Sequence, residues 1–217
     1  MKKEEVSQEQ YLKILECIVP ILMKNGLKAT TMDSLASNMQ MSKRTLYEIF
    51  GSKDEMFREA HKYFHNKMAE KLKHIFENSG NIMEAIINCF LYNRDLMSIV
   101  NAEFIRDMEQ FATQDNLISE SKRRHHYQAL YEVLQMGVEQ GYFREDINLK
   151  VQCRMFLLQM ESLKRTEELF PEDITLLEVY DSIMVGFLRS NSSQKGLAEL
   201  EKFMPSLTKT ANSTKQT

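Results

Sequence analysis

The residues best suited to chemistry lie close together between Thr30 and Phe57, in the stretch TTMDSLASNMQMSKRTLYEIFGSKDEMF. Hydroxyl, ammonium, guanidinium and phenol groups follow one another there, at Ser42, Lys43, Arg44, Thr45 and Tyr47. On the first turns of an exposed helix, such side chains and the free backbone amides beside them can meet phosphate oxygens and base edges. The alternative is an ordinary solvated end of a helix. We interpret the cluster as a surface that contacts DNA.

Each side chain of this surface has an expected part. Arg44 is the candidate for guanine, because a guanidinium can make two parallel hydrogen bonds to that base. Thr45 would touch base or backbone, and Ser42 would cap the helix. The remaining residues, Thr31, Lys43, Tyr47 and Lys53, are expected to contact phosphate oxygens. The predicted DNA-binding set is Thr31, Ser42, Lys43, Arg44, Thr45, Tyr47 and Lys53.

Three helices are predicted to position this surface. A capping box at residues 7–10 starts a first helix that ends near Gly26, where a left-handed residue is expected. Thr30 or Thr31 caps a second helix, and Ser42 caps a third after a tight turn. This order is typical of a helix-turn-helix. The apolar residues of the third helix, directed back at the first two, are Leu46, Ile49 and Phe50.

A long fourth helix is predicted to connect this unit to the rest of the chain. Ser52 and Glu55 form a second capping box, and apolar residues recur at helical spacing as far as Ile75. The predicted architecture is all-α. We place a helix-turn-helix domain at 1–52, the connecting helix at 53–78, a second helical domain at 79–190 and a polar, partly disordered tail at 191–217.

The second domain is expected to consist of further helices, at 81–93, 95–111, 114–140, 148–168 and 171–189. The last two carry apolar residues on more than one face. A helix pair with one face on its own core and another still apolar needs a partner, and a second copy of the same pair is the simplest one. We therefore expect a two-fold homodimer through a four-helix bundle formed by helices 148–168 and 171–189.

Composition limits the class of protein. The chain has 217 residues, 43% of them hydrophobic, and a formal net charge of −3. No apolar run approaches the roughly 20 residues needed to cross a membrane, so we expect a cytoplasmic protein with no membrane partner. Three dispersed cysteines indicate neither a disulfide framework nor a zinc knuckle. From residue 24 to 53 the charge balance is positive, with five basic residues against Asp33 and Glu48.

The chain resembles the TetR family of transcriptional regulators. The similarity is concentrated in residues 14–57 and is carried by Gly26, Thr30, Thr31, Leu35, Ala36, Ser42, Lys43, Thr45, Leu46, Tyr47, Phe50, Ser52, Lys53 and Phe57. Three departures occur: Gln40 replaces a turn glycine, Met41 a frequent valine, and Glu48 with Ile49 the usual aromatic or histidine residues. Gln40 is expected in a left-handed conformation, at a cost of about 1 kcal/mol relative to glycine.

This resemblance implies that residues 79–190 bind an effector as well as forming the dimer. The expected pocket is apolar, and fifteen methionines in the chain would make it adaptable. Apolar residues at helical spacing are also found in an ordinary protein core, and spacing alone does not distinguish a ligand pocket from a core. The candidate ligand-binding residues are Phe90, Phe104, Met108, Tyr127, Tyr131 and Met160.

The resemblance favours a ligand-responsive repressor that binds a palindromic operator as a homodimer and is not an enzyme. No catalytic residue, cofactor or metal is expected. One alternative is a helical-bundle metal protein or enzyme, since His61 and His65 lie four residues apart on the predicted fourth helix. Another is a protein-binding adaptor whose helix-turn-helix no longer reads DNA, which the negative charge of Glu48 would permit.

Overall fold

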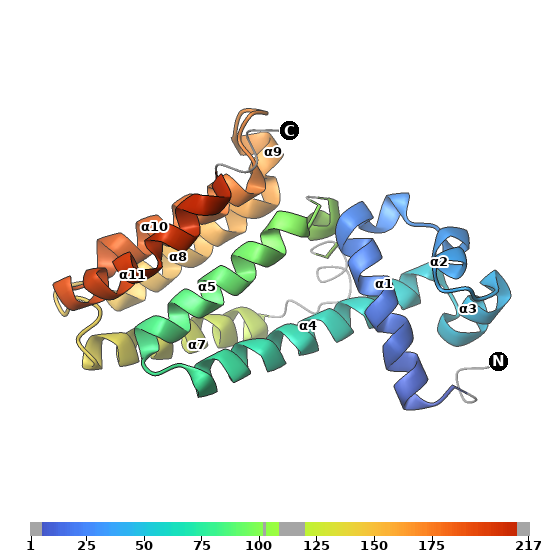
Figure 1. The fold of residues 1–217 in the computed structure, drawn as a ribbon, viewed down its shortest axis with the longest axis horizontal. Coiled ribbons are helices and arrows are strands. Elements are labelled where there is room, and N and C mark those ends of the chain that lie inside the picture. Colours follow the sequence, from blue (N-terminus) through green and yellow to red (C-terminus); the bar gives the residue numbers. More distant parts are fainter. Residues whose placement is uncertain (1–5, 102, 109–119, 212–217) are drawn as a thin grey trace. The chain divides into compact units, whose positions relative to one another are not determined.

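The computed structural model describes residues 6–101, 103–108 and 120–211 and, outside 120–123 and 205–211, their side chains. Within these ranges every regular element is a helix, as Figure 1 shows, which confirms the all-α prediction. None of these helices is long and apolar enough to cross a membrane. The chain divides into two compact units: unit 1 is Met1–Lys71 with Ile99–Leu117, and unit 2 is Leu72–Ser98 with Ile118–Thr217.

Helix α1 (Gln8–Ala29) begins unit 1 at the predicted capping box. Ser7 Oγ accepts a hydrogen bond from Gln10 N, and Gln10 Oε1 accepts one from Ser7 N, both at 3.2 Å. Gly26 interrupts the helical dihedral angles with a φ of 74°. A Cβ at this position would lie 2.9 Å from the Cβ of Glu103. The backbone conformation and this neighbour therefore both require glycine at the point where α1 turns toward α2.

Helices α2 (Met32–Asn38) and α3 (Lys43–Phe50) form the helix-turn-helix. Thr31 caps α2, since its Oγ1 accepts a hydrogen bond from Ser34 N at 3.1 Å. Between the two helices Gln40 has a φ of 53°, which is the left-handed conformation predicted from the sequence. The inner faces of the three helices share one apolar core, which contains Leu15, Ile18, Leu22, Leu35, Leu46, Ile49 and Phe50.

Replacing Gln40 by glycine is expected to raise the free energy of unfolding by about 1 kcal/mol, because a side chain in the left-handed region costs roughly that amount. Denaturation of both proteins in urea measures the difference. Gly51, with a φ of 78°, provides the reverse comparison, and Gly51→Ala should lower the same free energy. A Gln40→Gly protein no more stable than the parent would show that this turn is not strained.

Helix α4 (Lys53–Asn78) begins in unit 1 and continues into unit 2. Two phenols join it to α1: Tyr11 Oη donates to Glu59 Oε2 at 2.9 Å, and Tyr63 Oη donates to Glu16 Oε1 at 3.0 Å. Burial, followed by the hydrogen bond to Glu16, raises the pKa of Tyr63 to about 12. The phenol therefore stays protonated near neutral pH and keeps its hydrogen bond between the two helices.

Unit 1 also contains a segment that lies much later in the sequence. Asn101 N donates to Met23 O at 2.8 Å, and Leu27 N donates to Asp107 Oδ2 at 2.6 Å. The ring of Phe104 packs edge-on against Phe57 and Phe64, with centroids 6.4 and 5.9 Å away. Asn101, Phe104 and Asp107 thus connect this later segment to the helices that support the helix-turn-helix.

Unit 2 is built from the end of α4 and six further α-helices within the described residues. These are α5 (Ile82–Ile99), whose last residue is assigned to unit 1, α7 (Glu120–Glu139), α8 (Leu149–Ser162), α9 (Thr166–Leu169), α10 (Leu176–Asn191) and α11 (Gln194–Ala211). A short 3-10 turn, Leu163–Arg165, joins α8 to α9. Their shared core contains Met83, Ile87, Phe90, Leu134, Phe143, Cys153, Tyr180, Phe187, Leu188 and Leu200.

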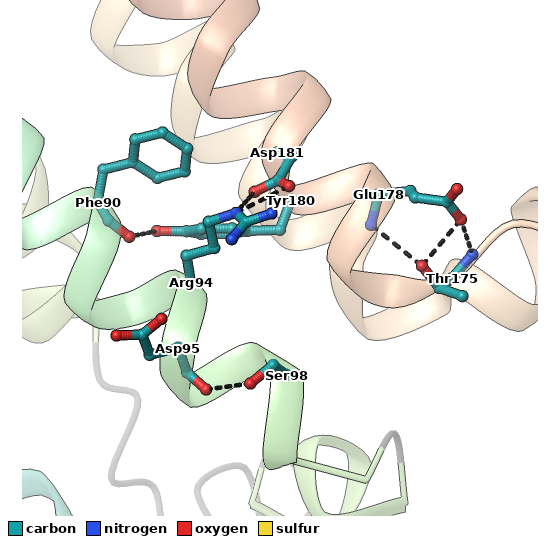
Figure 2. A network of polar contacts seen from close by, with 8 residues as sticks. All are labelled: Phe90, Arg94, Asp95, Ser98, Thr175, Glu178, Tyr180 and Asp181. Atoms are coloured by element: carbon teal, nitrogen blue, oxygen red, sulfur yellow. Dashed lines mark hydrogen bonds and ion pairs between the residues drawn. The ribbon is translucent and has the colours of Figure 1, made fainter. Parts of the chain in front are cut away.

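The predicted break between helices 81–93 and 95–111 is wrong, because α5 continues through it to Ile99. Arg94, which lies between the two predicted helices, is buried on α5, with 5% of its side chain exposed. Its Nε donates to both carboxylate oxygens of Asp181 on α10, at 2.8 and 2.9 Å (Figure 2). The ion pair lets a charged residue face the interior without interrupting the helix.

The predicted bounds of the C-terminal helices also need correction. The expected helix 148–168 ends as an α-helix at Ser162, and the expected helix 171–189 starts only at Leu176. The start is set by a capping box between Thr175 and Glu178 that the sequence reading missed. The tail expected from 191 onward contains helix α11, whose Leu200 is fully buried in the core of unit 2.

Candidate DNA interface

Helix α3 presents one polar and one apolar face. Leu46 and Ile49 are almost completely buried, whereas Tyr47 is 42% exposed and Lys43 and Arg44 lie open to solvent. Ser42 is the N-cap, and its Oγ accepts a hydrogen bond from the backbone N of Thr45 at 3.0 Å. The buried face fixes α3 in unit 1, and the first turns are left accessible to a ligand.

Lys43 is held by a carboxylate from the preceding helix. Its Nζ lies 2.7 Å from Asp33 Oδ2, and both side chains are about half or more exposed. The hydrogen bond, together with the opposite charge of Asp33, raises the pKa of Lys43. An exposed pair of this kind contributes little to stability. A phosphate can therefore replace Asp33 as the partner of Lys43 at small cost.

Arg44 is held by Glu48, one turn further along the same helix. Its Nε donates to Glu48 Oε1 at 2.8 Å, while 88% of the arginine side chain remains exposed. The hydrogen bond to Glu48 raises the pKa of Arg44, which is charged in any case. Glu48, whose negative charge on this face was a departure from the family pattern, thus faces the cation beside it.

The other predicted DNA-binding residues lie at the starts of α2, α3 and α4. Thr31 is exposed and caps α2, Thr45 is partly buried, and its Oγ1 lies 2.7 Å from the hydroxyl of Ser42. Lys53, the first residue of α4, is partly buried. The seven residues therefore belong to the first turns, or to the caps, of three consecutive helices of unit 1.

Two acidic partners were missed by the sequence reading. The four-residue spacing of Arg44 and Glu48 could have revealed their pairing, because such residues face each other on a helix. Lys43 and Asp33 are ten residues apart across the turn, and no periodic pattern predicts their contact. The cations of the DNA-facing helix are therefore partly neutralised within the free protein.

The candidate effector residues are distributed over both units. Phe104 and Met108 belong to unit 1, whereas Phe90, Tyr127, Tyr131 and Met160 belong to unit 2. Phe90 is 1% exposed and packs against Tyr180 with ring centroids 5.7 Å apart. Tyr127 and Tyr131 stack on α7, and the guanidinium of Arg154 lies 4.7 Å from the Tyr127 ring centroid.

An open hollow of about 480 Å³ lies on the surface of unit 2. Of the six candidate effector residues, Tyr131 lines it. Its other walls come from the loop before α8 and the start of that helix, and they carry both acidic and basic side chains: Glu145, Asp146, Ile147, Asn148, Leu149 and Lys150.

His61 and His65, the pair considered for zinc, lie on α4 with ring centroids 4.5 Å apart. Among the described residues, no group of three or more His, Cys, Asp or Glu side chains is arranged to hold a metal ion. His61 is largely buried beside the apolar core of unit 1. The geometry gives no support to a metal protein built on this pair.

The third helix is capped, exposed and preceded by a tight turn, and a long helix follows it into a second helical unit. This arrangement is typical of helix-turn-helix regulators of transcription. Comparison with known proteins gives the family. Residues 14–60 match the model of the bacterial regulatory proteins of the tetR family. Residues 14–60 therefore form a DNA-binding domain of the TetR family, which confirms the resemblance seen in the sequence, and the curated relatives are transcriptional repressors.

Relatives and solved structures agree with this assignment. The chain is 24% identical over 146 residues to the transcriptional repressor KstR2 of Mycobacterium tuberculosis. The aligned region covers 65% of this chain and 73% of the relative. The structure of the ketosteroid transcriptional regulator KstR2 from that organism is similar in fold, with a TM-score of 0.57 at 19% identity over 87% of this chain and 98% of that one. AibR, solved with isovaleryl coenzyme A and operator DNA, has a TM-score of 0.52 at 19% identity over 80% and 95%.

Proposed function

We propose that this chain is a ligand-responsive repressor in the cytoplasm, which binds an approximately palindromic operator as a homodimer and leaves it when a small molecule binds. The observation that carries the proposal is the polar face of α3. Lys43, Arg44 and Tyr47 are exposed there, while Leu46 and Ile49 anchor the opposite face. In a two-fold dimer, the two copies of α3 would read major grooves roughly 34 Å apart.

An apolar stripe on α8 supports the dimer. Val151, Met155 and Leu158 follow one another at helical spacing and are 47%, 51% and 65% exposed. Large apolar side chains gathered on one exposed helix face are typical of a protein interface. We propose that α8 packs there against a second copy, within the four-helix bundle expected from the sequence.

The exposed face of α10 fits the same bundle. Ser182 and Gly186 are exposed one turn apart, and a Cβ built at Gly186 would meet nothing within 4 Å. Glycine inside a helix costs about 1 kcal/mol relative to alanine. Nothing within the described chain requires it here, whereas close approach of a partner helix would. The α10 helices of two copies are therefore proposed to cross near Gly186.

The proposed effector acts through dimer geometry. A small molecule that binds one arrangement of the dimer better than another would change the separation of the two α3 helices, with α4 as the connection. We assign effector binding to Phe90, Tyr127, Tyr131 and Met160 in unit 2, with Phe104 and Met108 in unit 1 as the further candidates. Since AibR was solved with isovaleryl coenzyme A, acyl-CoA thioesters are the first compounds to screen for release from DNA.

Two substitutions test DNA reading. The bound sequence is first selected from random duplexes, and affinities are then measured by fluorescence anisotropy at several salt concentrations. Arg44→Ala is expected to cost about 1 to 3 kcal/mol of binding free energy and to relax the preference at one base pair. Lys53→Ala should weaken all sequences alike and flatten the dependence of affinity on salt, because it removes a phosphate contact.

Lys13→Ala is the matched control for these variants. Lys13 is an exposed residue of α1 in unit 1, paired with Glu9 and outside the predicted interface. Its removal should leave the base preference unchanged. If Arg44→Ala and Lys53→Ala both bind like the parent protein, the chain does not read DNA through α3, and the adaptor hypothesis is favoured instead.

A further inference from the structure

Glu48 restricts the way in which Arg44 can present its guanidinium. The carboxylate oxygen Oε1 accepts from Nε, the donor nearest the side-chain stem, at 2.8 Å. A guanidinium carries five N–H groups in a rigid plane, and four of them are on the two terminal nitrogens, Nη1 and Nη2. With Nε occupied, the end of the plane that carries these two nitrogens is the edge left for a ligand.

The pair is a poor stabiliser of α3 itself. Arg44 lies in the first turn of the helix and Glu48 in the last, so each charge has the same sign as the partial charge of the nearer helix end. The order of the residues, cation before carboxylate, is also the weaker one for pairs four residues apart. At 88% exposure of Arg44, the ion pair adds little to the stability of the fold.

We propose that Glu48 is a positioning residue, which holds the Arg44 guanidinium with its Nη1 and Nη2 edge toward the major groove and thereby sets the preference for guanine. This inference rests on the proposed DNA-reading function. O6 and N7 of guanine are two neighbouring acceptors, which match two parallel N–H groups from one edge of a guanidinium. Ordering a long side chain before binding reduces the entropy lost on binding.

Glu48 is expected to have two opposite effects on DNA affinity, one from its negative charge and one from its acceptor oxygen. As a negative charge near phosphates, Glu48 weakens binding to every duplex. As the acceptor for Arg44 Nε, it strengthens binding to the duplexes with guanine at the position that Arg44 reads. Glutamine keeps the acceptor oxygen and loses the charge, whereas alanine loses both, so the two substitutions distinguish these effects.

The experiment compares Glu48→Gln and Glu48→Ala with the parent protein on the selected duplex and on duplexes changed at the base pair whose preference Arg44→Ala removes. Both variants are expected to bind all duplexes more tightly. Glu48→Ala should reduce the ratio of affinities for guanine over the other bases by about two- to tenfold, and Glu48→Gln should retain most of that ratio. Glu9→Ala, which breaks an exposed pair with Lys13 in the same unit, is the control and should change neither quantity.

The possible outcomes separate this inference from the proposed function. If Arg44→Ala removes the guanine preference but Glu48→Ala keeps the parent ratio, Arg44 reads the base without help and the inference is overturned. Equal loss of the ratio in Glu48→Gln and Glu48→Ala would also overturn it, since the acceptor oxygen would then not matter. If Arg44→Ala itself changes nothing, the proposed function fails first. Circular dichroism and thermal unfolding confirm that each variant is folded.

Discussion

A protein with Leu158 replaced by glutamate is expected to be a monomer at concentrations at which the parent protein is a dimer. Leu158 is 65% exposed in the single chain, so a charged side chain there leaves the fold of unit 2 intact. In the proposed dimer the same residue is buried twice, once from each copy. Each fully buried leucine contributes about 1.5 to 3 kcal/mol. Loss of both, with two carboxylates to be desolvated, should raise the dissociation constant roughly a thousandfold or more.

Sedimentation velocity over a range of concentrations measures this change. The matched control is Ile99→Glu, because Ile99 at the end of α5 is 63% exposed and lies outside the apolar stripe of α8. Its substitution should leave the dimer intact. The Leu158→Glu protein should also lose most of its operator affinity, since each copy then reads one half-site alone. A Leu158→Glu protein that still forms the dimer would show that α8 is not the interface.

The DNA-facing part of the fold could be predicted from the sequence because its signals are local. Capping pairs such as Ser7 with Gln10 act over three residues, and the structure contains them as predicted. The left-handed Gln40 was expected because it occupies the position of a turn glycine in the resembled family, and its φ is 53°. Where a hydrogen bond or a dihedral angle is fixed by neighbours in the chain, the sequence carries the information.

The second unit was harder to predict because its features depend on distant residues. Nothing near Arg94 indicates that Asp181, on another helix, allows it to be buried. Likewise, no local pattern shows that Leu200, near the C-terminal end of the chain, is buried in the core of unit 2. The packing of Phe104 against Phe57 and Phe64 in unit 1 also joins residues that are about 40 positions or more apart. Long-range packing of this kind leaves no periodic pattern.

Asp181→Ala is expected to destabilise unit 2 by about 3 kcal/mol, because it leaves the Arg94 charge in the interior without this carboxylate. Arg94 has 5% of its side chain exposed, whereas Asp181 has 26%. Water can therefore reach the aspartate more easily than the arginine if the pair is broken. Arg94→Met should accordingly cost less than Asp181→Ala, although both remove the same two hydrogen bonds (Figure 2).

The double variant Arg94→Met with Asp181→Leu completes the comparison. It removes both charges and fills the space with apolar atoms, so its free energy of unfolding is expected to lie within about 1 kcal/mol of the parent value. Thermal unfolding should show a decrease in Tm of roughly 6 to 12 °C for Asp181→Ala and little change for the double variant. If the double variant is instead as unstable as Asp181→Ala, the cost comes from lost packing around α5 and α10 rather than from the loss of the Asp181 carboxylate beside Arg94.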